Sequence, residues 1–274
     1  MSTFPMSQLV RIVSLAPSAT SIVCALGARK YLVGVTRWCR DVAPVNGLPA
    51  LGDCWRGDPA EVAALKPDLV LGSIPYKAET VDALLRCGLT FLAMTPRSLA
   101  DIYSDILLLG RLLGRERRAQ ALVRDMEKRM QRIAARARRA RRKPRVYIEI
   151  WANPFIVAPR WAEEMVALAG GRFVPVPDSD AARMVNERDV LAARPDIVIL
   201  AWAACGMRVN AKKVLQRPNW SQLPAVRRRQ VFIVSDENLN TPGPPVIAGL
   251  ERLARIIHPE LFGPPEDEKV RQVG

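Results

Sequence analysis

The chain of 274 residues contains one histidine, His258, and five scattered cysteines with no C-x-x-C pair. It has no G-x-S-x-G elbow, no H-E-x-x-H motif, no G-x-G-x-x-G after a predicted strand and no Walker loop. Each of these motifs carries the chemistry of a large enzyme class. A metal site or His-dependent triad would have to be built around His258, which we expect to be solvated or stabilised by the helix dipole at a helix C-terminus. We therefore predict no catalytic residues, no metal ligands and no enzyme.

The sequence also lacks any apolar run of the roughly 18 to 20 residues that a membrane span requires. Its first ten residues contain neither Lys nor Arg, so they do not resemble the basic start of a secretory signal. An odd, dispersed set of cysteines is typical of free thiols in a reducing compartment. As written, the chain is expected in the cytoplasm, or in the periplasm if the true start lies upstream.

Positive charge is abundant and unevenly placed. The formal net charge is +14, and the stretch from Arg115 to Arg145 holds fourteen Lys or Arg against three acids. An Arg-rich helix is usually a solvated face, and the alternative is a basic patch for anionic lipid or nucleic acid. No aromatic residue lies among these arginines and no nucleic-acid-binding motif occurs, so we do not expect a nucleic-acid partner.

One thirteen-residue pattern occurs twice without gaps, 128 positions apart. Residues 61–73 read EVAALKPDLVLGS, and residues 189–201 read DVLAARPDIVILA. Each copy predicts a short helix, closed by a basic residue and Pro, followed by Asp and a strand that is apolar on both faces. Two copies of one helix–strand unit predict two similar lobes, and two lobes predict a cleft between them.

The fold class that we predict is α/β, with two Rossmann-like lobes of parallel sheet joined by a long backbone helix. The first lobe covers residues 1–97, with strands at 11–15, 33–36 and 90–94 and helices from Pro17 and at 78–86. A capping box at Ser98 opens about 45 residues of nearly continuous helix, a stiff connector over 98–143 interrupted at Gly114. The second lobe covers 144–262, with strands at 145–150 and 231–234 and helices at 162–169 and 246–257. A loose tail over 263–274 follows.

Aromatic residues follow the predicted strands in both lobes. Ligands of parallel α/β sheets bind beyond the carboxyl ends of the strands, and an exposed Trp in a loop is costly without a partner. Six aromatics at that edge would line the predicted cleft: Trp38, Trp55, Tyr76, Trp151, Phe155 and Trp202. The polar loop at 236–243 would add carboxylate and amide groups that orient a large ligand.

The sequence is similar to the cobalamin-type substrate-binding proteins of ABC importers over about residues 11–258. The segments that carry the resemblance are RIVSLAPSAT at 11–20, LKPDLVL at 65–71, PRSL at 96–99, LLG at 112–114 and NLNTPG at 238–243. The resemblance implies little hinge motion, no cofactor of the protein's own, and a corrinoid such as cobalamin held by aromatic side chains and loop backbone. It further implies an ABC permease as partner; we expect a monomer.

The resemblance also implies which residues contact the ligand, at the positions where this sequence matches the motifs of the family. In the first lobe they are Pro17, Ser18, Trp38, Trp55 and Tyr76; Trp55 fits best, because the family places a Trp in that loop. In the second lobe they are Phe155, Trp202, Asp236, Asn238 and Asn240.

Family members also dock on the permease through one acidic residue on each lobe. Glu79 is placed to serve in the first lobe, whereas residues 205–217 offer only Arg208, Lys212, Lys213 and Arg217. The binding fold is therefore expected to be complete, while import through a permease is left open against a role as a soluble carrier.

One other ligand class, the metal chelates, and one other function class remain open. The protein could bind an iron–siderophore, haem or another metal chelate, with Cys39, Cys54 or Cys205 as soft ligands. Anionic chelates favour Arg clusters and sometimes His or Tyr ligands, whereas the predicted edge is aromatic and rich in amides. The third reading is an enzyme acting on a small metabolite in the same cleft.

Overall fold

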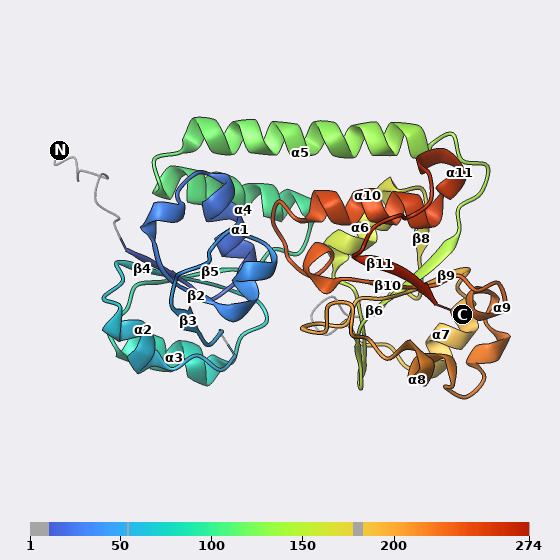
Figure 1. Cartoon of the computed structure of the whole chain (residues 1–274), viewed down its shortest axis with the longest axis horizontal. Helices are drawn as coiled ribbons and strands as arrows, with labels where there is room; N and C mark the ends of the chain where they lie inside the picture. The colour runs from blue at the N-terminus through green and yellow to red at the C-terminus, as the bar shows by residue number, and fades with distance from the viewer. Residues whose placement is uncertain (1–10, 54, 178–182, 274) are drawn as a thin grey trace. The chain divides into compact units, whose positions relative to one another are not determined.

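The protein is described by a computed structural model that covers residues 11–53, 55–177 and 183–273 (Figure 1). It divides into two compact units. The first runs to Met126 and includes Pro242–Pro244; the second comprises Glu127–Thr241 and Pro245–Gly274. The division falls inside α5 (Glu116–Ala137), so this helix contributes to both units. The two-lobed α/β fold predicted from the sequence is confirmed, whereas the domain limits 1–97, 98–143 and 144–262 stay predictions. No described helix is long and apolar enough to cross a membrane.

The first unit is built on an entirely parallel sheet with the strand order β3-β2-β1-β4-β5. Its strands are β1 (Ile12–Ser14), β2 (Leu32–Thr36), β3 (Ala50–Leu51), β4 (Leu69–Ser73) and β5 (Phe91–Met94). Strands β1 and β4 are buried along their whole length, which explains why they lack alternation. Because all five strands run the same way, their carboxyl ends share one edge.

Helices cover both faces of this sheet, α1 and α4 on one side and α2 and α3 on the other (Figure 1). They are α1 (Pro17–Ala25), α2 (Pro59–Ala64), α3 (Ala78–Arg86) and α4 (Leu99–Leu112), with 3-10 turns η1 (Arg29–Tyr31) and η2 (Arg37–Asp41). One core cluster joins strand residues Val13 and Val70 to Val62 of α2 and Leu84 of α3. Burial of these side chains is the main force that fixes the strand edge in place.

The predicted connector consists of two helices, α4 and α5, separated at Gly114. Ser98 and Asp101 form the expected capping box, since Asp101 N–H donates to Ser98 Oγ and the Asp101 carboxylate accepts from Ser98 N–H. The chain then turns at Gly114, whose φ of +61° favours glycine. A Cβ on Gly110 would lie 2.4 Å from Ala119 Cβ, so the two helices approach closely there. The interruption predicted at Gly114 is therefore confirmed, with α4 ending at Leu112 and α5 running from Glu116 to Ala137.

The second unit has a six-stranded sheet with the order β11-β10-β9-β6-β7, and β8 also pairs with β6. Its strands are β6 (Arg145–Ala152), β7 (Phe155–Val157), β8 (Arg172–Phe173), β9 (Ile197–Leu200), β10 (Val231–Val234) and β11 (Val270–Val273). The central strands β6, β9 and β10 are parallel, whereas β7 and β11 are antiparallel to their neighbours. The predicted parallel core is confirmed with an antiparallel strand at each end.

The helices of the second unit flank its sheet, with α6 and α10 together on one side and α7, α8 and α9 on the other (Figure 1). They are α6 (Arg160–Leu168), α7 (Glu187–Ala193), α8 (Ala211–Leu215), α9 (Pro224–Arg227), α10 (Val246–Ile257) and α11 (Pro259–Phe262), with 3-10 turns η3 (Trp220–Gln222) and η4 (Asp236–Asn238). The bounds predicted for α3, α10 and β10 agree with the structure. Amphipathic spacing defined these helices, and each ends at a recognisable stop.

The expectation of a loose tail over 263–274 was wrong for its described part. Residues 270–273 form β11 and pair with β10 from Val231↔Val273 to Val234↔Val270. Two ion pairs hold the approach to this strand, Arg252–Asp267 at 2.7 Å and Lys269–Glu237 at 2.7 Å. The segment was expected to be loose because its residues are charged, but the charges of Asp267 and Lys269 have partners in the folded unit.

The sequence repeat corresponds to a repeated structural device. In each copy the aspartate after the proline accepts the N–H of an arginine at the neighbouring strand, Asp68 from Arg11 and Asp196 from Arg145, both at 3.0 Å. The residue before the proline is left-handed in both copies, with φ of +48° at Lys66 and +46° at Arg194. Matching residues therefore perform matching tasks in two separate units.

Candidate functional site

The first strand edge begins with the turn from β1 into α1. Pro17 takes the first helical position, where its missing N–H has no hydrogen bond to lose. Ser18 is 5% exposed, and its carbonyl accepts a 2.7 Å hydrogen bond from Ser21 Oγ. Both predicted contact residues therefore lie at the amino end of α1, beyond the carboxyl end of β1. At this position the helix offers backbone N–H groups rather than a charged side chain.

Trp38 follows β2 in the short helix η2, where it is half-buried. The guanidinium of Arg37 lies 4.2 Å from the centroid of the Trp38 ring, within the range of a cation–π contact. The opposite side of η2 is anchored through Cys39, which accepts a hydrogen bond from Thr20 Oγ1 at 3.0 Å. This part of the edge therefore combines an aromatic surface with an exposed positive charge.

Trp55 lies in a tight loop after β3, and its side chain is 48% exposed. The carboxylate of Asp53 accepts the N–H groups of Trp55 and Arg56, both at 3.0 Å. The carbonyl of Asp53 accepts from Gly57 N–H, and a Cβ on Gly57 would lie 2.8 Å from that oxygen. The loop is thus fixed by its own hydrogen bonds, although it presents a large apolar ring to solvent. The neighbouring Cys54 lies outside the described residues.

Tyr76 follows β4 and is 47% exposed. With Pro17, Trp38 and Trp55, it completes the set of predicted contacts that follow four parallel strands of one sheet. The structure therefore brings these first-lobe residues to a single edge. Glu79, the predicted docking residue, is exposed in the first turn of α3, three residues beyond Tyr76. Its docking role stays a prediction.

In the second unit, the corresponding edge is organised by a buried carboxylate that the sequence analysis did not single out. Glu149 of β6 is fully buried. It accepts hydrogen bonds from Tyr147 OH at 2.6 Å and from Trp202 Nε1 at 2.9 Å. Burial, with the Glu149 charge next in order, holds the pKa of Tyr147 well above its usual range. The phenol therefore remains a donor.

Arg217 completes this cluster with a bidentate ion pair. Its two terminal nitrogens donate to the Glu149 oxygens at 2.7 and 2.9 Å. The same guanidinium lies 4.4 Å from the Phe155 ring centroid and 4.6 Å from that of Trp220. Two predicted contact residues, Phe155 and Trp202, are thus positioned by one buried ion pair. Of the four cations noted in residues 205–217, Arg217 is thus an internal counterion, since its side chain is only 13% exposed.

The loop after β10 uses most of its polar groups within the second unit. The two carboxylate oxygens of Asp236 accept Ala204 N–H and Gly206 N–H, both at 2.9 Å. Burial raises the pKa of Asp236 even though these bonds oppose the shift. Asn240 Nδ2 donates to the Ala201 carbonyl at 2.9 Å. Two buried amide atoms have no hydrogen-bond partner, Asn238 Nδ2 and Asn240 Oδ1. The side chains of Asp236 and Asn240 therefore shape the edge by bracing the turns after β9.

Of the three thiols considered as soft metal ligands, the two that the structure describes, Cys39 and Cys205, are not prepared for that role. Cys39 is fully buried, and burial raises its pKa against the opposing hydrogen bonds from Thr20 and Thr36. Burial and the charge of Asp236 also raise the pKa of Cys205. Metals bind thiolates, so a raised pKa disfavours ligation. No group of three or more potential His, Cys, Asp or Glu ligands occurs among residues 11–53, 55–177 and 183–273.

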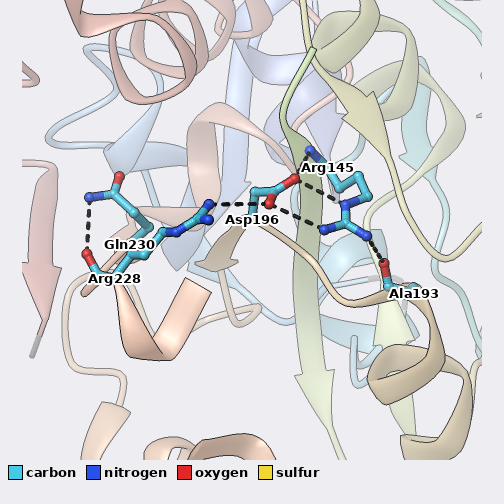
Figure 2. A network of polar contacts seen from close by, with 5 residues as sticks. All are labelled: Arg145, Ala193, Asp196, Arg228 and Gln230. Atoms are coloured by element: carbon cyan, nitrogen blue, oxygen red, sulfur yellow. Dashed lines mark hydrogen bonds and ion pairs between the residues drawn. The ribbon is translucent and has the colours of Figure 1, made fainter. Parts of the chain in front are cut away.

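A separate pocket of about 350 Å³ lies at the opposite edge of the second sheet, at the amino ends of β6, β9 and β10. None of the predicted contact residues lines it. Figure 2 shows its central network, in which Asp196 lies between the guanidinium groups of Arg145 and Arg228, at 3.0 and 3.6 Å. His258 also lines this pocket and is 2% exposed. His258 lies at the C-terminus of α10, as predicted. Of the two expectations for it, solvation was wrong, because its ring is buried within hydrogen-bonding distance of Glu260 and the Gly170 carbonyl.

Residues 12–237 match the model of a family described as "Periplasmic binding protein". An uncharacterized ABC transporter substrate-binding lipoprotein of Bacillus subtilis, YvrC, is 30% identical over 263 residues, covering 92% of this chain and 81% of the relative. A vitamin B12-binding protein of Vibrio cholerae is 24% identical over 250 residues, covering 89% and 87%.

The fold is also shared with solved structures. The periplasmic heme-binding protein RhuT from Roseiflexus sp. RS-1, in its apo form, superposes with a TM-score of 0.76 at 25% identity. The match covers 92% of this chain and 98% of that one.

Proposed function

The chain belongs to the family of periplasmic binding proteins, and we propose that it binds a corrinoid, cobalamin in the first instance, for an ABC-type importer. Members of this family are substrate-binding proteins of transport systems rather than enzymes. The relatives and neighbours carry names that include vitamin B12, heme and iron. The choice among these ligand classes therefore has to rest on the side chains of this chain.

One observation favours the corrinoid, namely that the cation beside Phe155 in the second unit is already neutralised by a buried carboxylate. The positive charge of Arg217 lies beside Phe155 but is neutralised by Glu149 through two hydrogen bonds. Phe155 and Trp202 consequently present rings without a free cation behind them. A broad, mostly uncharged corrin buries apolar surface on such rings, whereas the carboxylates of an anionic chelate would find no bidentate partner there.

Haem is the second candidate, and the first unit supplies the observation that favours it. Arg37 stacks on Trp38, and Arg56 is exposed next to Trp55. Both guanidiniums lie beside predicted contact residues and could pair with the propionates of a porphyrin. Tyr76 is 47% exposed at the same edge, and a tyrosinate is an established kind of axial ligand for haem iron.

Parallel titrations with cyanocobalamin, haemin and a ferric siderophore separate these candidates. Binding is followed by Trp fluorescence, corrected for ligand absorbance, and by calorimetry. Saturable binding of cyanocobalamin at about micromolar or tighter, equivalent to about −8 kcal/mol, is the expected result. Binding of haemin alone, with a Soret shift that Tyr76→Phe abolishes, would replace the corrinoid by haem. Saturable binding of the siderophore alone would assign the site to an iron chelate.

The transport context is a separate part of the proposal. Docking on a permease would use Glu79, which is exposed on α3. On α8 and just before it, Arg208, Lys212 and Lys213 are exposed. Reconstitution with the cognate permease, comparing Glu79→Gln with the unaltered protein, tests the importer role. Unchanged ligand delivery in this variant, or ligand binding without any delivery, would favour a soluble carrier.

A further inference from the structure

Helix α5 carries an exposed face made only of Arg, Lys, Gln and Ala. Its cations Arg117, Arg124, Lys128 and Arg132 follow one another at spacings of seven, four and four residues, which keeps them on one side of a helix. Between them this side carries Gln120, Ala121, Gln131 and Ala135, all exposed. We call these four cations the basic stripe. At 1.5 Å per residue it extends over roughly 22 Å.

The acids of α5 flank the stripe. At 100° per residue, Glu116 and Glu127 lie roughly a quarter turn or more from the mean direction of its four cations, whereas Asp125 lies about 65° from that direction, on the side of Arg132. The opposite face is buried through Ala119, Val123, Met126, Met130 and Ala137. No hydrogen bond or ion pair joins a side chain of the stripe to another described residue, whereas Arg129, one position further around, pairs with Glu251. The stripe is therefore a row of four cations whose side chains form no ion pair within the described part of the chain, on a helix that is ordered by its buried face.

We propose that the basic stripe docks the protein on the surface of an anionic phospholipid membrane. A flat anionic surface is complementary to a straight row of cations, and each Lys or Arg near such a surface strengthens binding roughly fivefold. The stripe has no apolar side chain that would enter the hydrocarbon region, so the contact is electrostatic and reversible. The helix is already ordered by its buried face, so docking requires no folding of the segment.

The geometry favours a membrane over nucleic acid. The major groove admits a helix that enters it with side chains reaching the base edges. The opposite face of α5 is packed against the rest of the protein, so α5 cannot enter a groove and can only lie against the outside of a duplex. Single strands are bound by combining charge with aromatic stacking, and α5 contains no aromatic residue. A membrane needs only the exposed side.

The test is co-sedimentation of the full chain with phosphatidylcholine vesicles that contain or lack phosphatidylglycerol. The stripe variant is Arg124→Gln/Lys128→Gln/Arg132→Gln. Its matched control, Arg172→Gln/Arg188→Gln/Arg227→Gln, removes the same charge from exposed positions on β8, α7 and α9. Gln preserves helix propensity, and an unchanged unfolding temperature establishes that each variant is folded.

The unaltered chain is expected to bind only the phosphatidylglycerol vesicles, with binding lost between about 0.05 and 0.5 M salt. Three lost cations at about fivefold each should weaken binding roughly 100-fold in the stripe variant, with a change of less than about threefold in the control. Arg124→Lys/Arg132→Lys should retain binding, because it keeps the charges. Equal losses in both triple variants, or equal binding to neutral vesicles, would overturn the proposal. So would tighter binding of mixed-sequence duplex DNA that depends on the same three residues.

Discussion

Trp202 donates its indole N–H to the buried carboxylate of Glu149 over 2.9 Å, although 53 residues separate them in the chain. Glu149 is fully buried and also accepts from Tyr147 and Arg217. One carboxylate thereby sets the orientation of an aromatic residue at the strand edge and neutralises the nearest cation. The contribution of this ion pair to the free energy of unfolding can be measured separately from the affinity of the site for its ligand.

Arg217→Met should destabilise the protein by about 3 to 5 kcal/mol, because it leaves the Glu149 charge buried without its counterion. The double variant Glu149→Gln/Arg217→Met should recover a large part of this loss, since both charges are removed together. Urea unfolding measures both. Arg228→Met is the control: its ion pair with Asp196 is long, at 3.6 Å, and its side chain is 60% exposed, so the expected cost is below about 1 kcal/mol. Equal costs at Arg217 and Arg228 would contradict the prediction.

Trp55→Ala should weaken binding of the preferred ligand about 10- to 100-fold, which corresponds to about 1.4 to 2.7 kcal/mol of lost ring contact. Its ring is 48% exposed on a loop braced by Asp53, so unfolding by urea should change little. Leu85→Ala, on the exposed side of α3, removes a similarly accessible side chain away from the strand edge and should leave affinity unchanged. Calorimetric titration compares the two. A full-affinity Trp55→Ala variant would remove Trp55 from the site.

Asp105→Asn should stabilise the protein at neutral pH. Burial, with a smaller contribution from the Asp101 charge, raises the pKa of Asp105 to about 6. The folded state therefore binds this proton more tightly than the unfolded chain, and stability falls as the pH rises from about 4 to 6. Removing the charge should gain about 1 to 3 kcal/mol at pH 7, with the gain disappearing below pH 4.

Urea unfolding across this pH range measures the Asp105 effect. Asp82→Asn serves as the control, because Asp82 is exposed and forms an i,i+4 ion pair with Arg86. This control should lose a few tenths of a kcal/mol at neutral pH. A pH-independent difference for Asp105→Asn would mean that burial does not shift the titration of Asp105.

Lys66→Gly and Arg194→Gly should each stabilise the protein by about 0.5 to 1 kcal/mol. Both residues hold a left-handed backbone, with φ of +48° and +46°, which is unfavourable for a residue with a Cβ. Glycine removes that strain, but part of the gain is offset because glycine loses more backbone conformational entropy on folding. Arg188→Gly inside α7 should instead destabilise by about 1 kcal/mol. Thermal unfolding checks all three, and destabilisation at both repeat positions would contradict the shared role that we assign to them.

Local sequence patterns predicted most of the fold. The apolar stripe of α10 and its stop at His258 defined that helix, and the uninterrupted apolar run of β10 defined that strand. Predictions failed where distant partners decide the outcome. The charged residues of 265–273 gave no sign that Asp267 pairs with Arg252 or that β11 joins the sheet. The interruption of the connector, by contrast, could be predicted from a local signal, because Gly114 suits the left-handed turn between α4 and α5.

The candidate site shows the same contrast between local patterns, which could be predicted, and contacts between distant residues, which could not. The positions of Trp38, Trp55 and Tyr76 beyond parallel strands could be predicted, because strand direction places all carboxyl ends at one edge. Glu149 could have been noticed as an acidic residue in an otherwise apolar strand. Its cation could not have been identified, because Arg217 is 68 residues away and looked like one of several surface cations. Long-range ion pairs leave no periodic trace in a sequence.

The short strand β11 also bears on how the protein behaves in concentrated solution. Without it, β10 would offer the buried segment Val-Phe-Ile-Val as an open sheet edge, the kind of template on which misfolded chains stack into fibrils. With it, the outermost strand is Val-Arg-Gln-Val, whose Arg271 and Gln272 are exposed. The four residues of β11 thus cover an apolar sheet edge with a strand that carries exposed polar side chains. Loss of the pairing between β10 and β11 would expose an edge that is prone to aggregation.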